Sequence, residues 1–296
     1  MSDLMNTQEV AAYLRIKERK IYDLVRQGGI PCTRVGGKWL FPRDRIDQWL
    51  ERAGTAAPER RAASATAPRV MAGSHDPLLE WCVASSDCGL ALLSGGSLDG
   101  LERLATGQAS ACGIHVLDPA TGTYNVPAIE RTLAGHDVVA VEWAWREQGL
   151  VVAPGNPLGV ASLDDLAAQR ARVAIRPPGS GARVLMDHLL AQAGIGLGEL
   201  SLAEPAVRSE LEVGLAVLDG RADTGLAVRA VARQLRLDFV PLHRERYDLV
   251  VRRRDYFEPE MQALLEFARS HDAVAKANDL QGYDLSSFGA VRYNAP

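Results

Sequence analysis

This 296-residue chain lacks the segments that direct a protein into or across a membrane. No apolar run approaches the roughly 20 residues that a transmembrane helix needs. Residues 1–25 contain neither a basic start nor the apolar core of roughly 7–15 residues that marks a signal peptide. We therefore expect a cytoplasmic protein without a membrane partner, rather than an exported transport binding protein.

Cysteine is scarce, with four in the chain, and no two of them form a C-x-x-C pair. Scattered cysteines in a cytoplasmic protein are typical of free thiols rather than disulfides. A metal site made of Cys82, Cys88 and Cys112 is an alternative. Our prediction is that the chain has no metal site and no catalytic cofactor.

Familiar catalytic motifs are also missing. The sequence contains no Gly-x-Ser-x-Gly elbow, no P-loop and no His-Glu-x-x-His motif. Ser74, His75 and Asp76 are consecutive, but adjacent residues rarely form a catalytic triad. We therefore predict no catalytic residues, and an enzyme is kept as the distant alternative.

The net charge of −4 is unevenly distributed along the chain. Residues 1–54 hold 10 Lys and Arg against 7 Asp and Glu, and residues 55–71 hold 3 against 1. Residues 72–296 hold 20 against 29. A basic N-terminal piece on an acidic body indicates that only the N-terminus meets a polyanion.

Residues 55–70 form a break in composition, rich in Ala, Pro, Ser, Thr and Arg without apolar periodicity, and are interpreted as a linker. Beyond it, strand-like and helix-like segments alternate, as in Arg172–Arg176 followed by Ala182–Gly194. Two further strands, Leu237–Leu242 and Tyr247–Val251, are predicted on either side of a short loop. The alternation predicts an α/β domain with a mainly parallel sheet.

Residues 1–54 show the order helix, turn, helix, hairpin, helix. The first helix is predicted to begin with Thr7 as its N-cap, and Pro42 is placed in the first turn of the last helix. Two β-prone runs flank Gly36–Gly37, which is a two-residue hairpin signal. This order predicts a winged helix-turn-helix, mostly α with a β-hairpin wing.

The strings T-x-x-x-A-x-x-L, G-x-I-P and R-V-G-x-K-W-x-F-P fall in register between Leu4 and Leu50. Together they resemble the excisionase/MerR-like family of DNA-binding domains. That resemblance implies a second helix in the major groove of double-stranded DNA and a wing against the backbone or minor groove. A solvated basic face is the alternative for the helix taken alone.

DNA contacts are expected from the exposed polar side chains of the second helix and the wing, because such groups reach phosphates and guanine edges. These residues are Lys17, Arg19, Lys20, Tyr22, Arg26, Thr33, Arg34 and Lys38. A module with so few cations binds DNA weakly alone, so we expect a homodimer that reads two half-sites of an operator.

Three turns in the rest of the chain have the composition of an anion cradle. Gly73–Pro77, Ser94–Ser97 and Pro178–Arg183 each follow a strand-like run and lead into a helix-like run. The start of a helix presents unpaired N–H groups and the positive end of the helix dipole. Ordinary helix capping is the alternative for each turn, but α/β sheets bind ligands where several such turns meet.

The strings A-G-S-H-D-P, L-L-S-G-G-S and G-S-G-A-R lie within residues 70–291. They resemble the periplasmic-binding-protein-like domain of molybdate- and tungstate-type binding proteins and of regulators that use it. The resemblance implies a two-lobed, type II α/β domain over residues 71–296. Lobe I would comprise residues 71–149 and 248–296, and lobe II residues 150–247, with chain crossings near 149–152 and 242–247.

Contacts with the ligand are expected from the cradle turns and from two residues near the crossings. They are Ser74, His75, Ser94, Gly96, Ser97, Asn125, Ser180, Gly181, Ala182, Arg183 and Tyr247. Asp76 is a poor anion ligand and is predicted to cap the helix that follows it. Relatives commonly have Thr at the position of Ala182, and they carry Asn-Arg before that loop where this chain reads Ala174-Ile175-Arg176, which leaves the identity of the oxyanion open.

The combined expectation is a DNA-binding transcriptional regulator that senses a small oxyanion, molybdate or tungstate, in a cleft between two lobes. The cradle turns are nearly free of aromatic residues, which favours a compact tetrahedral ion over a large organic ligand. The same regulator with another small anion or an organic acid as its ligand is the alternative.

Overall fold

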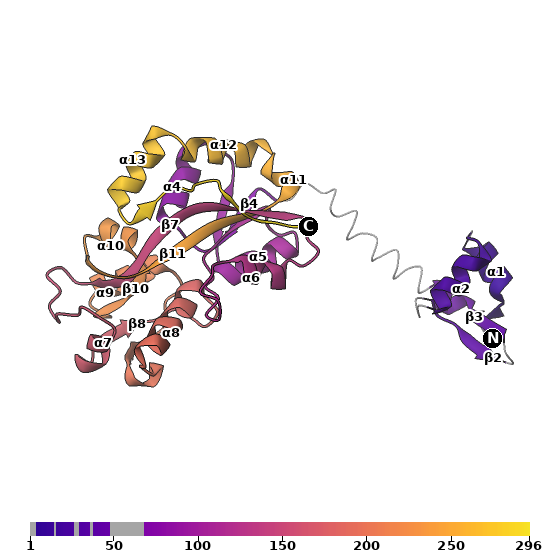
Figure 1. The fold of residues 1–296 in the computed structure, drawn as a ribbon, viewed down its shortest axis with the longest axis horizontal. Coiled ribbons are helices and arrows are strands. Elements are labelled where there is room, and N and C mark those ends of the chain that lie inside the picture. Colours follow the sequence, from indigo (N-terminus) through magenta and orange to yellow (C-terminus); the bar gives the residue numbers. More distant parts are fainter. Residues whose placement is uncertain (1–3, 15, 27–29, 36–37, 48–67) are drawn as a thin grey trace. The chain divides into compact units, whose positions relative to one another are not determined.

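The computed structural model describes residues 4–14, 16–26, 30–35, 38–47 and 68–296. The chain divides into two compact units, residues 1–66 and 67–296 (Figure 1). Several predicted features lie outside the described residues. These are most of the linker, the hairpin turn Gly36–Gly37 and the end of the last N-terminal helix.

The N-terminal unit combines short helices with a three-stranded sheet. Its elements are β1 (Leu4–Met5), α1 (Thr7–Tyr13), α2 (Glu18–Arg26), β2 (Thr33–Val35) and β3 (Lys38–Pro42), and residues 43–47 are helical. The strand order is β1-β3-β2, and β2 pairs antiparallel with β3 as the predicted wing does. A small core including Val10, Ile21 and Phe41 holds these elements together.

Two predicted boundaries in this unit are wrong by one residue. Asn6, not Thr7, caps α1: its side chain accepts from the N–H groups of Gln8 and Glu9, and Glu9 returns a bond to the N–H of Asn6. This reciprocal capping box satisfies the N–H groups of Asn6, Gln8 and Glu9 together, and it depends on Asn6 as the cap. Pro42 ends β3 instead of opening the helix, because its partner Leu4 on β1 extends the strand.

The C-terminal unit is built on one ten-stranded sheet with the order β5-β4-β6-β11-β7-β10-β8-β9, and with β12 and β13 pairing to β7. Its first half, residues 70–132, alternates strands and helices. The elements are β4 (Val70–Gly73), α4 (Pro77–Ser85), β5 (Ala91–Ser94), α5 (Ser97–Ala105), β6 (Ala111–Ile114) and α6 (Val126–Thr132).

The second half, residues 164–235, repeats this alternation. Its elements are α7 (Asp164–Ala168), β8 (Arg172–Ala174), α8 (Gly181–Ala193), the 3-10 turn Leu197–Glu199, β9 (Ser201–Ala203), α9 (Glu210–Leu218), β10 (Thr224–Val228) and α10 (Arg229–Leu235). Within each half the neighbouring strands β5-β4-β6 and β10-β8-β9 are parallel.

Two 15-residue strands, β7 (Val138–Val152) and β11 (Asp238–Arg252), run antiparallel through the middle of the sheet and pair with both halves (Figure 1). The prediction of two strands separated by a loop is therefore wrong, since β11 is continuous with irregularities after Pro241 and Tyr247. The sheet is also mixed rather than mainly parallel. The two predicted crossing regions, 149–152 and 242–247, lie on these strands.

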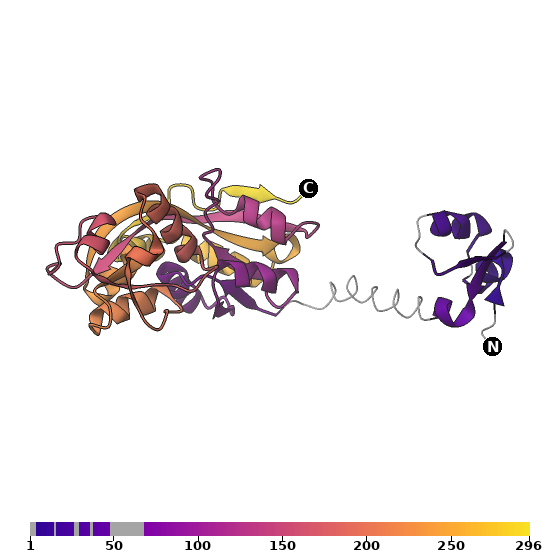
Figure 2. The ribbon, with the colours of Figure 1, turned by 90° about the horizontal axis from the view of Figure 1, so that it is seen from below.

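The chain ends with α11 (Arg253–Tyr256), α12 (Pro259–Ala268), α13 (His271–Leu280), β12 (Tyr283–Asp284) and β13 (Val291–Asn294). Figures 1 and 2 show helices on both faces of the long strands. Val141 and Trp143 of β7 pack in the core that contains α4, α12 and α13, whereas Ala140 packs in the core under α5 and α6. Alternate residues of one strand thus enter opposite layers, which explains why the run Val138–Val141 of β7 is continuously apolar.

Candidate functional site

The exposed face of α2 carries the predicted DNA contacts. Arg19 and Lys20 are exposed on this helix, and Lys17 is exposed immediately before it. Ile21, which follows Lys20, is fully buried, so the basic residues point away from the core. Tyr22 is 46% exposed, which leaves its ring and hydroxyl available on the same surface. The side chain of the predicted contact Arg26 lies outside the described structure.

The wing carries the remaining predicted contacts. Thr33, Arg34 and Lys38 are all exposed on β2 and β3. The Arg34 guanidinium lies 5.5 Å from the centre of the half-buried Trp39 ring, opposite it in the β-ladder. This contact supports the cation on the surface of the wing.

In the C-terminal unit, the start of α5 brings two predicted serines together. Ser97 opens α5 and is fully buried, and its Oγ lies 2.9 Å from Ser74 Oγ. The N–H of His115 donates to Ser97 Oγ at 3.1 Å. The N-cap Gly96 offers no side chain to this helix start, so the first N–H groups of α5 have no side-chain cap.

The start of α8 meets this group from the second half of the unit. Gly181, its first residue, is buried, and a Cβ placed there would lie 2.8 Å from the carbonyl oxygen of His115 and 2.9 Å from its ring. At Gly179 the corresponding position lies 3.9 Å from Leu98 of α5. The starts of α5 and α8 therefore face each other beside His115. We call the region formed by Ser74, Ser97, His115 and Gly181 the junction.

The remaining predicted ligand residues of the cradle turns lie around the junction, and several of their side chains bond to residues outside it. Ser180 is buried and caps α8 by accepting from the N–H of Arg183, and Ala182 is 2% exposed in the first turn. The Arg183 side chain pairs with Asp187 at 2.8 Å. His75 is 2.9 Å from Glu80 through Nε2, and Ser94 is exposed at the end of β5.

Two predicted ligand residues have their side chains committed to the fold. Asn125 is fully buried, and its amide donates to Arg246 O and Asp248 Oδ2 while its Oδ1 accepts from the N–H of Val116. Tyr247 is also fully buried and donates its hydroxyl to the carbonyl oxygen of Ser74. In this structure the donors of both side chains are bonded within the protein, and contact of either one with a ligand stays a prediction.

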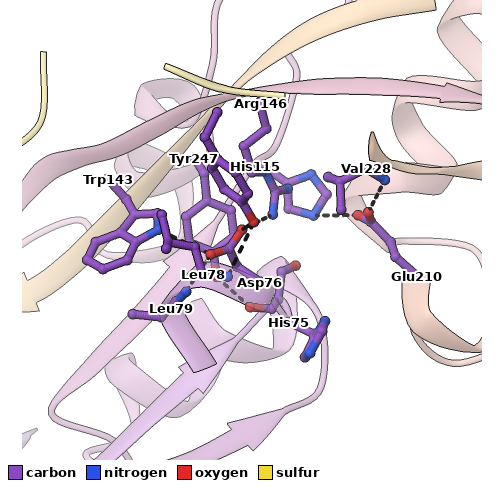
Figure 3. A network of polar contacts seen from close by, with 12 residues as sticks. His75, Asp76, Leu78, Leu79, His115, Trp143, Arg146, Glu210, Val228 and Tyr247 are labelled. Atoms are coloured by element: carbon purple, nitrogen blue, oxygen red, sulfur yellow. Dashed lines mark hydrogen bonds and ion pairs between the residues drawn. The ribbon is translucent and has the colours of Figure 1, made fainter. Parts of the chain in front are cut away.

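Beneath the junction lies a buried charged network that the sequence prediction missed. Arg146 of β7 is 1% exposed and donates to Asp76 Oδ2 at 2.9 Å and to Glu245 Oε1. Asp76 also accepts from Trp143 Nε1, Tyr283 OH and the N–H of Leu79. The prediction that Asp76 caps α4 is confirmed, but the same carboxylate also anchors a long-range ion pair (Figure 3).

His115 extends this network toward the second half. Its Nδ1 lies 2.8 Å from Glu245 Oε2, and its Nε2 lies 3.9 Å from Oε1 of Glu210, the first residue of α9 (Figure 3). Gln148 of β7 donates to both carboxylates, at 3.1 Å to Glu210 and 2.9 Å to Glu245. Burial alone would raise the pKa of Glu245, but the charges of Arg146 and His115 lower it to about 2.

A second missed residue is Arg176, in the loop before α8. Its Nε is buried and has no hydrogen-bond partner among the described residues. Burial lowers the pKa of Arg176, and the neighbouring Glu210 and Glu212 partly counter that effect. A sequence signal existed for two of the residues in the buried network, since Arg146 and Gln148 are polar residues in a strand that is mostly apolar.

A cavity of about 460 Å³ lies away from the junction, on the second half of the unit. Arg229, Phe239 and Gln281 are among the residues that line it. None of the predicted ligand residues lines this cavity.

Comparison with known protein families accounts for both units. Residues 83–269, more than half of the chain, match the PBP superfamily domain. The chain belongs to the PBP superfamily. Residues 4–54 match a helix-turn-helix domain, so the predicted fusion of an excisionase-like DNA-binding domain to a periplasmic-binding-protein-like domain is confirmed.

Two relatives align with substantial parts of this sequence. The chain is 28% identical over 299 residues to the uncharacterized protein YvgK of Bacillus subtilis (strain 168), and the match covers 96% of each chain. It is 29% identical over 109 residues to an uncharacterized protein in the 5′ region of the ferredoxin 2Fe-2S gene of Clostridium pasteurianum. That match covers 36% of this chain and 96% of the relative.

Solved structures confirm the predicted α/β fold of the larger unit. A phosphate ABC transporter substrate-binding protein from Clostridium perfringens, solved with bound phosphate, is 14% identical with a TM-score of 0.53. The match covers 70% of this chain and 96% of that protein. The sulfate-binding protein SubI from Mycobacterium tuberculosis H37Rv is 15% identical with a TM-score of 0.51, covering 72% and 85%.

Among the described residues, no helix combines the length and apolar character that a bilayer crossing requires. A helix-turn-helix domain fused to a binding-protein domain supports a DNA-binding regulator that binds a ligand.

Proposed function

We propose that this protein is a cytoplasmic transcriptional regulator that senses a small oxyanion, molybdate or tungstate, at the junction. The N-terminal unit would read an operator in double-stranded DNA, as a homodimer on two half-sites. The alternative within the same architecture is another small anion or an organic acid.

The observation that carries this proposal is the meeting of two helix starts beside two serine hydroxyls. Ser74 and Ser97 come from one half of the unit and Gly181 from the other. Helix N–H groups and hydroxyls are neutral donors suited to a tetrahedral anion, and buried Gly181 lets the backbone approach closely. Arg176, with its unpaired Nε, is the nearest candidate for a positive charge before α8.

The structural neighbours support a compact anion as the ligand. One was solved with phosphate and another is named a sulfate-binding protein, and both share this fold. Molybdate and tungstate have the same tetrahedral shape as these ions. The distinction among the four ions is a matter for direct titration.

A regulatory mechanism follows from the connectivity. The strands β7 and β11 pair with both halves of the sheet, so a change in their curvature changes how the halves meet. A ligand held by donors from both halves favours the arrangement in which the halves lie close together around it, which we call closed. It shifts the equilibrium only as far as it prefers that arrangement over the open one.

The test is a titration of the full chain with molybdate, tungstate, sulfate and phosphate while its melting temperature is followed. At 100 times the dissociation constant, binding to the native state adds about 2.7 kcal/mol, which raises the melting temperature by about 5–10 °C. We expect Ser97→Ala to reduce the shift because it removes a hydroxyl from the junction. Ser201→Ala, at an exposed position on β9, should retain it.

No shift with any of the four ions at millimolar concentration would contradict the oxyanion proposal. If only an organic acid shifts the melting temperature, the proposed ligand is wrong, but the proposed site is retained.

A further inference from the structure

The charges beneath the junction are not balanced by hydrogen-bonded partners. Asp76, Glu210 and Glu245 are buried carboxylates, and the buried Arg146 pairs with only the first and the last of them. Glu210 accepts from two neutral groups, Gln148 Nε2 and the N–H of Val228. The charge of the half-buried Arg176 also acts on Glu210, but no ion pair within 4.0 Å joins the two side chains. Glu210 is therefore a buried carboxylate without a directly bonded cation, which leaves a place for a further positive group beside it.

The orientation of His115 indicates where that positive group lies. Its Nδ1 is engaged by Glu245, which holds the ring with Nε2 toward Glu210. A carboxylate on one imidazole nitrogen and a free second nitrogen is the arrangement found around metal-ligating histidines. The 3.9 Å between Nε2 and Glu210 Oε1 is too long for a hydrogen bond. Two ligands of one ion, each about 2.0–2.2 Å from it, are typically separated by about 3–4 Å.

Gln148 provides an independent observation. Its side chain is fully buried, and its Oε1 has no hydrogen-bond partner within the described part of the chain, whereas its Nε2 lies between the carboxylates of Glu210 and Glu245. A half-turn of the amide would exchange the two atoms and direct Oε1 at the same point. The amide would then give up the two bonds that Nε2 donates to Glu210 and Glu245 and gain an oxygen ligand for a cation placed between these groups.

We infer that the junction holds a divalent transition-metal cation, with His115 Nε2 and Glu210 as ligands and Gln148 Oε1 as a third. Among the described residues, His115, Glu210 and Glu245 are the group whose ligand atoms cluster closely enough, within 4.8 Å of one another. Glu245 orients the imidazole from its far side. One imidazole with oxygen ligands suits Zn²⁺ or a neighbouring first-row ion.

This site goes beyond the proposed oxyanion sensor and does not depend on it. Its consequence for that sensor is electrostatic. A cation beside Ser97 and Gly181 would offset the buried carboxylates that otherwise repel an anion at the same place.

The experiment is a calorimetric titration of metal-free, full-length protein with Zn²⁺ alone, without any oxyanion. Cys32→Ser serves as the background, because Cys32 is the one free cysteine that is not buried. We expect one site per chain, weakened at least tenfold by Glu210→Gln, which keeps the side-chain shape and removes the charge. Glu130→Gln, at an exposed position on α6, should bind as the background does.

Equal Zn²⁺ affinity in Glu210→Gln and the background would overturn the inference, as would the absence of a stoichiometric site. If Glu210→Gln does not fold, as judged by its melting transition, crystals of the unaltered protein soaked in Zn²⁺ decide the question. An anomalous peak between His115 and Glu210 supports the site, and its absence there rejects it. Because no oxyanion is present, failure of this site leaves the oxyanion proposal standing.

Discussion

At the residue scale, the buried ion pairs of Arg146 stabilise the fold and also fix the positions of neighbouring groups. Arg146 lies over the Tyr247 ring, 4.4 Å from its centre, while it holds Asp76 and Glu245. Removing one member of such a buried set costs about 3–5 kcal/mol, because the remaining charges lose their partner. The network therefore fixes the position of His115 in the junction and of the start of α4.

Because the pKa of Glu245 is lowered in the folded protein, we expect the free energy of unfolding to depend on pH. The folded-state pKa is about 2, below the ordinary value of 4.5. The stabilisation is thus present above pH 4.5 and is lost as the pH falls toward 2, and it amounts to on the order of 3 kcal/mol. We expect Glu245→Gln to lower the unfolding free energy at pH 7 and to flatten its decline between pH 5 and 2.

Urea denaturation across this pH range measures the effect, with Glu130→Gln as the exposed control. An equally steep acid decline in Glu245→Gln and the unaltered protein would show that Glu245 is not ionised in the fold as described.

The contacts of Asp76 show which residue roles could be predicted from the sequence and which could not. The cap formed by Asp76 is local, within three residues of Leu79, and was predictable. The pairing of Asp76 with Arg146 spans 70 residues and that of Arg146 with Glu245 spans 99. Such contacts depend on strand order, which periodicity does not reveal. For the same reason the contacts of Asn125 with Asp248 and of Tyr247 with Ser74 were not predicted.

At the scale of elements, the start of α8 packs closely against His115 at Gly181. We expect Gly181→Ala to destabilise the unit by about 1–3 kcal/mol, because the new methyl meets the immobile carbonyl of His115 at 2.8 Å. The same change should weaken oxyanion binding. Gly198→Ala is the matched control, since nothing lies within 4 Å of its added methyl.

Denaturation and the melting-temperature titration report the two effects separately. If Gly181→Ala binds the oxyanion as tightly as Gly198→Ala does, the start of α8 is not part of the site.

The helix α2 provides a second expectation at this scale. We expect the double variant Arg19→Ala, Lys20→Ala to bind duplex DNA at least tenfold more weakly at fixed salt, because two phosphate-neutralising cations are lost. Its oxyanion affinity should be unchanged. Arg131→Ala, on the exposed surface of α6, serves as the control for charge alone.

Fluorescence anisotropy with labelled duplex DNA gives the affinities and their salt dependence. Unchanged DNA affinity in the double variant would mean that α2 is not the recognition helix.

The elements that sequence predicted well are those with local signals. The helices α5 and α8 begin within one residue of their predicted starts, at Ser97 and Gly181. The strand β11 was divided into two because His243–Arg246 interrupts its apolar pattern. Those polar residues are accommodated in the long central strand, where Glu245 has buried partners, so the interruption marks buried polar contacts rather than a loop.

At the scale of the whole molecule, the two units divide the function between them. The family matches establish a helix-turn-helix domain and a PBP superfamily domain in one chain. Coupling between them requires that the ligand change the affinity for DNA, and linkage then requires that DNA change the affinity for the ligand by the same factor.

The most direct test of this coupling is the affinity of the full chain for its own DNA sites with and without molybdate. Sites are first selected from a random duplex library, and dissociation constants are then measured at one salt concentration. We expect saturating molybdate or tungstate to change the DNA affinity at least about fivefold, in either direction. Identical DNA affinities with and without every tested oxyanion would contradict a ligand-responsive regulator.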